Sequence, residues 1–271
     1  MNRMRGFLVL SLLVLCYGAL AASRAAAAPA PLPIKNVILV HGAWADGSSW
    51  SVVIPLLQSR GLHVVAVQMP LTSLKDDARV IRRAIADADG PVFLVAHSYG
   101  GGPATEAGTD CKIAGIMYVA ASAPDVGESF ADLVKRYPLP PALHQARLTS
   151  AGFFVISPTG MRDDIAPDLP ASEAAVLVAE QNPLASKAFA DRVDVAAWRS
   201  KPTWYVVAGH DRTVSVALER MVARRMHAKT ITIPSSHMVI ISHATEIANF
   251  VDAALTTLSA RGMPRDPHCT R

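Results

Sequence analysis

Charged and aromatic residues are scarce in this chain. They make up 18% and 6% of its 271 residues, whereas apolar residues make up 51%. The low charge content disfavours a solvated helical bundle and favours a heavily buried sheet. The apolar content excludes disorder, and the composition is not that of collagen. The length fits one large α/β domain or two small ones, and we expect one large domain.

Beyond its N-terminal leader, the chain has almost equal numbers of basic and acidic residues. The formal net charge is +4, but Arg3, Arg5 and Arg24 lie in an N-terminal leader that has no acidic residue. Without this leader, 23 basic residues face 22 acidic ones. Because no basic stripe is interleaved with aromatic residues either, we expect no nucleic-acid partner.

The leader has the order of a secretory signal peptide. Met1 to Arg5 is positively charged, residues 6–22 are apolar, and Ala19-Leu20-Ala21 has the small-x-small pattern of a cleavage site. A second possible site is Ala25-Ala26-Ala27. The alternative, a membrane anchor, is disfavoured because the apolar run is short for a span of about 20 residues.

These features divide the chain in two. We expect residues 1–28 to be a signal peptide with an Ala-rich lead-in, cleaved near 21–28, and residues 29–271 to be one secreted or periplasmic domain without a stable membrane anchor. Cys111 and Cys269 remain after cleavage, and an oxidising compartment permits them to pair. A disulfide and two separate thiols stay open as alternatives, since sequence gives no distance between them.

Short β-branched runs alternate with stretches of helical periodicity from Ile34 onward. Almost no polar residue interrupts these runs, which is typical of a parallel sheet covered on both faces. The sequence therefore predicts a doubly wound α/β fold with a mostly parallel sheet. The six predicted strands are residues 34–41, 64–67, 92–96, 113–120, 203–207 and 230–233.

The alternation lapses between about residues 125 and 200. Seven prolines interrupt short helical patches there, and the segment contains Phe130, Phe153, Phe154 and Phe189, four of the seven phenylalanines of the chain. We predict a helical cap insertion over the strand ends. It is either a lid over a ligand pocket or an extra helical subdomain whose aromatic residues form its own core.

A predicted strand leads directly into Ala96-His97-Ser98-Tyr99-Gly100. A strand followed by small-x-Ser-x-Gly and a helix start is the context of a nucleophile elbow. Ala96 stands where glycine is usual, but it is still small. A dinucleotide-binding turn is disfavoured, because the G-x-G-x-x-G spacing is absent. Ser98 is therefore the predicted nucleophile.

A serine nucleophile needs a base and an orienting carboxylate, which follow the serine in the order acid, then histidine. Asp211 lies just past the predicted strand 203–207, and Asp125, past the preceding strand, is the competing acid. We favour Asp211 because it immediately precedes the segment that must supply the histidine. His237 is the predicted base because it follows a strand, unlike His227, His243 and His268.

Further residues are expected around these three. The backbone N–H groups of Ala43, in the turn His41-Gly42-Ala43-Trp44, and of Tyr99 are the predicted oxyanion donors. Trp44, Asp46 and Phe130 are candidates for the lining of a substrate pocket. His41, His97 and His210 are interpreted as scaffold residues that form hydrogen bonds.

The His-Gly turn, the elbow around Ser98, Asp211 and Ser236-His237 together resemble the α/β-hydrolase superfamily over about residues 34–258. More narrowly, they resemble its compact esterase and hydroxynitrile-lyase branch. The resemblance implies a Ser-His-Asp mechanism. Plant enzymes of this branch that cleave cyanohydrins carry a threonine after the first histidine and a lysine after the catalytic histidine. This chain has Gly42 and Met238 there, which favours ester hydrolysis over the lyase reaction.

We therefore expect a serine hydrolase, a carboxylesterase that acts on small to medium apolar esters through an acyl-enzyme. The alternatives are a lactonase, an amidase or a hydroxynitrile-lyase-type enzyme with the same triad, or a hydrolase-fold protein that only binds its ligand. No cofactor and no metal is expected, because no ligand-spaced Cys/His cluster and no phosphate loop is present. Acyl and alcohol preference and oligomeric state are not predicted.

Overall fold

The structure is a computed structural model that describes residues 34–261. The predicted signal peptide, its cleavage sites and Cys269 lie outside the described residues. Cys111, which is within them, is disulfide-bonded.

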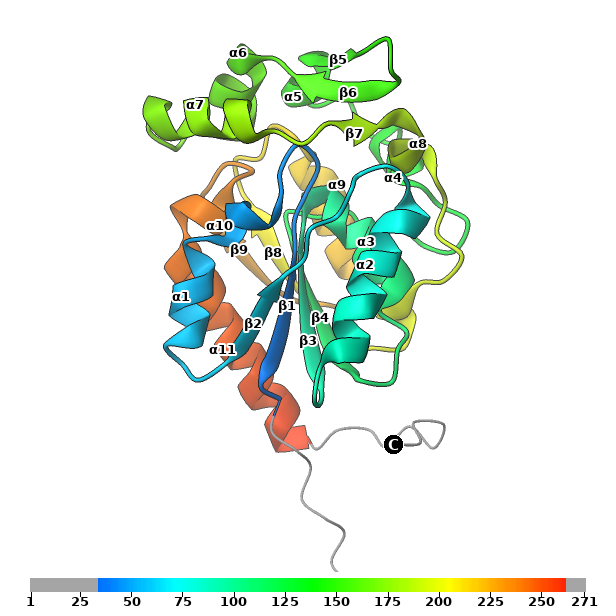
Figure 1. Ribbon diagram of the computed structural model, residues 1–271, viewed down its shortest axis with the longest axis vertical. Helices are drawn as coiled ribbons and strands as arrows, with labels where there is room; N and C mark the ends of the chain where they lie inside the picture. The colour runs from blue at the N-terminus through cyan, green and yellow to red at the C-terminus, as the bar shows by residue number, and fades with distance from the viewer. Residues whose placement is uncertain (1–33, 262–271) are drawn as a thin grey trace, which may run out of the picture. The chain divides into compact units, whose positions relative to one another are not determined.

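A six-stranded sheet forms the centre of the fold (Figure 1). Its strand order is β2-β1-β3-β4-β8-β9, and each neighbouring pair is parallel. The strands agree with the six predicted runs to within two residues at each end, so the predicted doubly wound parallel sheet is confirmed. They are β1 (Asn36–Val40), β2 (His63–Ala66), β3 (Val92–His97), β4 (Ile113–Val119), β8 (Thr203–Ala208) and β9 (Lys229–Ile233).

Helices cover both faces of this sheet and create two cores. Side chains of alternate residues, such as Ile38 and Val37 on β1, enter opposite cores because successive residues of a strand point to opposite faces. This explains why the four inner strands are buried at every position. One core includes residues of α2 (Leu74–Asp87), α3 (Gly101–Ala107) and α9 (Val216–Arg225); the other includes residues of α1 (Val53–Gln58), α10 (Val239–Ser242) and α11 (Ala244–Arg261).

Helix α2 shows how the sequence determines one of these elements. Ser73 caps it, because the Ser73 hydroxyl accepts a hydrogen bond from Asp76 N and donates one to the Asp76 carboxylate. Leu74, Ala78, Ile81 and Ile85 recur at helical spacing and are buried on the sheet.

The segment between β4 and β8 forms a cap above the carboxyl ends of the strands (Figure 1). Its helical elements are α4 (Phe130–Val134), α5 (Pro141–His144), α6 (Pro158–Gly160), a π-helix η3 (Met161–Ile165), α7 (Ala171–Glu180), α8 (Ser186–Ala190) and a 3-10 turn η4 (Ala197–Arg199). The cap also contains a small antiparallel sheet that we did not predict. This sheet consists of β5 (Ala146–Leu148), β6 (Phe153–Ile156) and β7 (Leu184–Ala185).

The cap's aromatic residues pack on one another. The Phe189 ring makes edge-to-face contacts with Phe130 and with Phe154, at centroid distances of 4.9 and 5.8 Å. Other cap residues, Met161, Ile165 and Leu177, line a cavity at the carboxyl ends of the strands. The aromatic residues also pack against the two cores of the sheet, so they do not form a core of the cap alone, and the lid stays a prediction.

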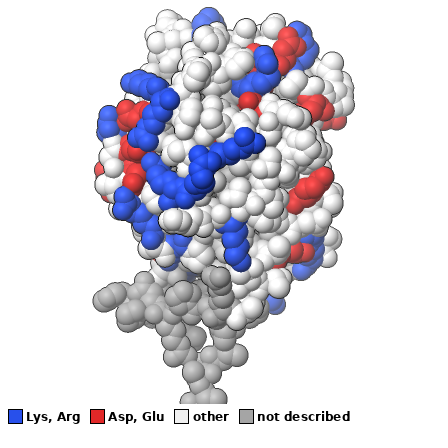
Figure 2. Space-filling model, turned by 180° about the vertical axis from the view of Figure 1, so that it is seen from behind, with Lys and Arg blue, Asp and Glu red and all other residues white. Residues whose placement is uncertain are grey.

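The surface carries charges of both signs. Lys and Arg gather on one part of the face turned away from the view of Figure 1 (Figure 2). Several arginines are paired: Arg225 and Arg136 with Glu128, and Arg199 with Asp125. The residue counts do not reveal this uneven distribution, and the absence of a nucleic-acid partner stays a prediction. In residues 34–261, no helix combines the length and hydrophobicity that crossing a bilayer requires.

Candidate active site

Ser98 lies at a sharp turn between β3 and the short 3-10 helix η2 (Ser98–Gly100). Its φ of +55° is in the left-handed region, which a residue with a side chain adopts only when the surroundings enforce it. Two glycines permit these surroundings. A Cβ on Gly100 would lie 2.3 Å from the carbonyl oxygen of His41, and a Cβ on Gly101 would lie 1.9 Å from that of Ser122. The turn is thus pressed against neighbouring loops, as in a nucleophile elbow.

The structure brings together Ser98, His237 and Asp211. His237 Nε2 lies 2.8 Å from Ser98 Oγ, and His237 Nδ1 lies 2.6 Å from Asp211 Oδ2. All three residues are buried, with exposed fractions of 6%, 3% and 8%. The competing acid, Asp125, instead forms a two-pronged ion pair with Arg199 at the surface.

Backbone groups fix the orientation of Asp211. Its Oδ1 accepts hydrogen bonds from the N–H groups of Thr213 and Val214, at 2.6 and 2.8 Å. This arrangement leaves Oδ2 for the imidazole of His237. Because an ionised carboxylate only accepts, His237 Nδ1 must donate to it, and in the neutral ring Nε2 is then an acceptor facing Ser98.

Two further histidines, His97 and His41, form buried hydrogen bonds next to the site. Burial lowers the pKa of His97 well below its usual value, so the ring is neutral, and it lies 2.9 Å from the carbonyl oxygen of His237 through Nε2. Burial also lowers the pKa of His41, which accepts from Met69 N. Both rings form scaffold hydrogen bonds. His210 contributes no such bond, because its side chain is exposed.

The turn after β1 lies directly against Ser98. A Cβ on Gly42 would lie 2.7 Å from Ser98 Cβ and 3.3 Å from Ser98 Oγ, so only glycine fits. Ala43, the next residue, lines the cavity beside His237. The side chain of Tyr99 is also fixed, because its hydroxyl donates a 2.7 Å hydrogen bond to the buried Asp77. Both residues chosen as oxyanion donors therefore lie in segments with little freedom.

The three residues named for the pocket have different positions. Trp44 is buried and lines the cavity beside His237. Asp46 caps a 3-10 helix, η1 (Gly47–Trp50), by accepting from Ser48 N. Phe130 packs on Phe189 within the cap. Neither Asp46 nor Phe130 is among the residues that line this cavity.

The cavity beside His237 is small and mostly apolar. Its volume is about 20 Å³, which is room for about one water molecule. Its lining consists of Ala43, Trp44, Ala45, His97, Met161, Ile165, Leu177, His237 and Met238. Ser98 is not among the residues that line this cavity, and the flexible methionines and Leu177 give the lining freedom to adjust.

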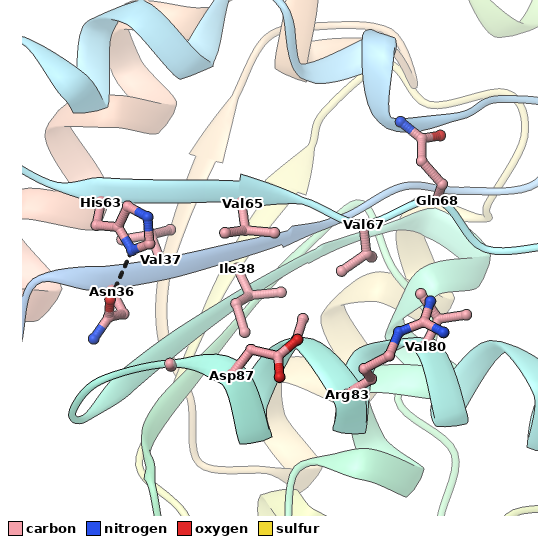
Figure 3. A pocket seen from close by; sticks show the side chains of 12 residues that line it. Asn36, Val37, Ile38, His63, Val65, Val67, Gln68, Val80, Arg83 and Asp87 are labelled. Atoms are coloured by element: carbon pink, nitrogen blue, oxygen red, sulfur yellow. Dashed lines mark hydrogen bonds between the residues drawn. The ribbon is translucent and has the colours of Figure 1, made fainter.

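A larger cavity of about 330 Å³ lies elsewhere, between strands β1 and β2 and helix α2. Figure 3 shows its apolar floor, which includes Val65, Val67 and Ile38, and its polar rim, which includes Arg83 and Asp87. None of Ser98, His237 and Asp211 lines it. Chemistry requires the reacting groups to be adjacent, so the hydrogen-bonded groups at Ser98, and not this larger cavity, mark the candidate active site.

Sequence reasoning did not identify the cap residue that holds the His237 loop. The Asp168 carboxylate accepts hydrogen bonds from Ser235 Oγ, from Ser236 N and from the Ser236 hydroxyl. Partial burial acts to raise the pKa of Asp168, but the bonds from Ser236 and Ser235 outweigh it and lower the pKa. The adjacent serines before His237 were a signal for such a partner, but their partner lies 67 residues earlier in the chain.

Within residues 34–261, no group of three or more His, Cys, Asp or Glu side chains is arranged to hold a metal ion. The polar groups around Ser98 are instead bonded to one another. Their arrangement is suited to proton transfer between a hydroxyl and an imidazole.

Comparison with known proteins agrees with this geometry. The sequence model of the Alpha/beta hydrolase family matches residues 37–250. A probable hydrolase, R7, of Phoma sp. is 32% identical over 109 residues, which are 34% of this chain and 45% of that protein. A pyrethroid hydrolase of Sphingobium wenxiniae is 27% identical over 103 residues, 33% of this chain and 37% of that protein. The chain thus spans less than half the length of either curated relative.

Solved structures extend the likeness to most of the chain. The crystal structure of polyneuridine aldehyde esterase superimposes with a TM-score of 0.72 and covers 82% of this chain and 99% of its own, at 19% sequence identity. At this identity the likeness establishes the fold alone.

Proposed function

Because the chain belongs to the alpha/beta hydrolase family, we propose that it is a serine hydrolase for carboxylic esters of small to medium apolar substrates. Ser98 is the nucleophile, His237 the general base and Asp211 the residue that orients the imidazole. The observation that carries the proposal is the continuous hydrogen-bonded path from Ser98 Oγ through both ring nitrogens of His237 to Asp211.

The proposed reaction begins with acylation. Ser98 Oγ attacks the ester carbonyl carbon while His237 Nε2 takes its proton, and Asp211 stabilises the resulting imidazolium. The backbone N–H groups of Ala43 and Tyr99 donate to the oxyanion, and such a donor contributes about 3 kcal/mol in comparable enzymes. His237 then protonates the leaving alcohol, and the acyl group remains on Ser98.

Deacylation repeats these steps with water. His237 takes a proton from the water as its oxygen attacks the acyl carbon, and returns that proton to Ser98 Oγ when the acid leaves. The cavity beside His237 is large enough for one water molecule. No metal or organic cofactor takes part in either half of the proposed reaction.

The residues around His237 support an ester substrate. Met238 is 4% exposed and lines the cavity, so an apolar side chain stands where cyanohydrin-cleaving relatives carry an ammonium group. Without that charge nothing at this position stabilises a leaving cyanide. A relative named as a pyrethroid hydrolase is in line with this choice.

Export of the protein is a separate proposal. Two observations support it. The leader consists of a positively charged, an apolar and a small-x-small segment in that order, and Cys111 is disulfide-bonded, which fits an oxidising compartment. Mass spectrometry of the protein from the periplasm or medium should find a mature N-terminus near residues 21–28. A full-length cytosolic protein would contradict the proposal.

The decisive experiment compares the hydrolysis of p-nitrophenyl esters of increasing acyl length by the protein without residues 1–28 and by its variants. We expect Ser98→Ala and His237→Ala to lower kcat/KM by about a thousandfold or more, with circular dichroism unchanged. Ser59→Ala and His210→Ala are matched controls with exposed side chains and should retain activity.

Absence of turnover in the parent, or equal activity in parent and Ser98→Ala, would overturn the proposal. Product analysis with lactones, amides and cyanohydrins then tests the other reactions of the same triad. Saturable ligand binding without turnover would favour the binding protein.

A further inference from the structure

A second carboxyl group, that of Glu219, is buried next to Asp211. Glu219 lies in α9 and is 0% exposed. Its Oε2 accepts a 3.0 Å hydrogen bond from the N–H of Ala208, the last residue of β8. Its Oε1 has no donor facing it anywhere in the described part of the chain. Burying an ionised carboxylate that has one oxygen without a hydrogen-bond donor would cost folding free energy.

The charged and titratable groups that face Glu219 do not compensate a negative charge. From the loop after β8, Asp211 lies within hydrogen-bonding reach and is itself acidic. From β8, the Tyr205 hydroxyl already donates to the carbonyl of Ala121. Arg220, on the same helix, is the weakest of the influences on Glu219. Burial first, and then the charge of Asp211, raise the pKa of Glu219 well above its usual value.

Two carboxyl groups in contact can share a hydrogen bond only if one of them carries a proton. Asp211 is the one that must stay ionised, because Thr213 N, Val214 N and His237 Nδ1 all donate to it. The proton therefore belongs on Glu219, where it turns the unpartnered Oε1 into a hydrogen-bond donor.

We propose that Glu219 is a neutral carboxylic acid in the folded protein and that its Oε1 hydroxyl donates a hydrogen bond to Asp211. Glu219 is thereby a positioning residue for the acid of the triad. Its protonation state follows from the burial and contacts of Glu219 alone, whereas its positioning role rests on the proposed function.

The proton on Glu219 has a direct consequence for His237. The pair of carboxyl groups carries one negative charge instead of two, so His237 faces the field of a single carboxylate. Asp211 then accepts hydrogen bonds from His237 in the loop after β9, from Thr213 N and Val214 N in its own loop, and from Glu219 in α9. These bonds fix its carboxylate relative to three separate parts of the fold.

The protonation state can be measured without activity. Infrared spectroscopy at pH 8 should show the C=O band of a protonated carboxyl group, and Glu219→Gln should remove it. Asp77, the other buried carboxyl group with a raised pKa, of about 6, is ionised at that pH, so Asp77→Asn should leave the band in place. A missing band, or one that persists in Glu219→Gln, would overturn the proposal even in an inactive protein.

The positioning role is tested by two substitutions at the same position. In Glu219→Gln the amide can donate to Asp211 and accept from Ala208 N, whereas Glu219→Leu can do neither. We expect Glu219→Leu to lower kcat about tenfold with little change in KM, and Glu219→Gln to restore most of the loss. Val222→Ala, which removes buried apolar atoms from the same helix, controls for loss of stability and should not lower kcat.

The pH profile gives a second readout of the role. Because a general base must be unprotonated to act, activity should rise with pH, and Glu219→Gln, which leaves the charge of the site unchanged, should leave the position of this rise where it is in the parent. If Glu219 were ionised in the parent, removing its charge would move the rise to lower pH by more than about half a unit. That shift, or a Glu219→Leu variant with the kcat of the parent, would overturn the positioning role.

Discussion

The indole Nε1 of Trp44 donates a 3.0 Å hydrogen bond to the backbone carbonyl of Phe154. This bond joins the turn after β1 to strand β6 of the cap. Trp44 has a φ of +56°, so the contact helps to keep an unfavourable backbone conformation in place.

The cap is joined in a similar way to two further loops of the site. The buried Asp164 pairs with Arg212, which directly follows Asp211. Asp168 accepts from Ser235 and Ser236, which directly precede His237. The cap therefore covers the site and also holds three of the loops that form it: the turn after β1, the loop of Asp211 and the loop of His237.

Asp168→Ala should test this role of the cap. The substitution leaves Ser236 N without its acceptor and removes one of the acceptors of the Ser235 and Ser236 hydroxyls, so the His237 loop gains freedom. We expect kcat to fall about five- to tenfold with KM little changed. The free energy of unfolding should fall by about 1 kcal/mol or less, because the Asp168 side chain is only partly shielded from water, which can partly replace it.

Asp163→Ala is the matched control for this experiment, since Asp163 is an exposed residue of the same segment that pairs with Arg162. Steady-state kinetics and urea denaturation of both variants give the comparison. Equal kcat in the two variants would show that Asp168 does not position His237.

Asp77 should make stability depend on pH. Burial raises its pKa from 3.8 to about 6, despite hydrogen bonds from Tyr99 and Leu71 N. The folded protein thus binds a proton more tightly than the unfolded chain, so this group costs stability as pH rises from about 4 through 6. The shift corresponds to a cost on the order of 3 kcal/mol above pH 7.

Asp77→Asn should remove this dependence, because the amide is neutral at every pH in this range. The difference in unfolding free energy between the variant and the parent, measured by urea denaturation, should shift in favour of the variant between pH 4.5 and 7.5. A difference that is constant over this range would show that Asp77 does not titrate as described.

Two adjacent glycines in α3 should respond oppositely to alanine. A Cβ on Gly101 would lie 1.9 Å from the backbone oxygen of Ser122, whereas one on Gly102 would meet nothing closer than 3.6 Å. Gly101→Ala should destabilise the fold by more than about 3 kcal/mol. Gly102→Ala should be neutral or stabilise it by up to about 1 kcal/mol, because alanine favours the helix.

Thermal denaturation of both glycine variants decides this prediction. A Gly101→Ala protein with the melting temperature of the parent would mean that the loop of Ser122 can retreat from the elbow at little cost.

The central sheet was predictable from sequence because burial on both faces leaves uninterrupted apolar runs such as residues 92–96. The positions of Ser98, Asp211 and His237 followed from the same strands, since Ser98 comes directly after β3 and the other two lie in the loops that follow β8 and β9. The cap sheet was missed because its strands have two to four residues, too few to establish an alternation. Asp168 was missed because its partners are distant in sequence, and Glu219 because no motif marks a buried acid on a helix as a neighbour of Asp211.

Leu177 should limit the length of the acyl group. Its side chain, from α7, lines the cavity of about 20 Å³ beside His237, and alanine at this position would open that cavity toward the cap. We expect Leu177→Ala to move the optimum of a p-nitrophenyl ester series to longer acyl chains and to raise kcat/KM for the longest of them about tenfold, since each added methylene that becomes buried contributes about 0.8 kcal/mol.

Val176→Ala is the matched control, because Val176 is the preceding residue of the same helix and is 52% exposed. It loses a similar amount of side chain without changing the cavity, so its chain-length profile should coincide with that of the parent. If Leu177→Ala also kept the parental optimum while remaining folded, the acyl group would have to lie on the side of Ser98 away from α7. The lining formed by Met161, Ile165 and Leu177 would then contact the alcohol portion instead.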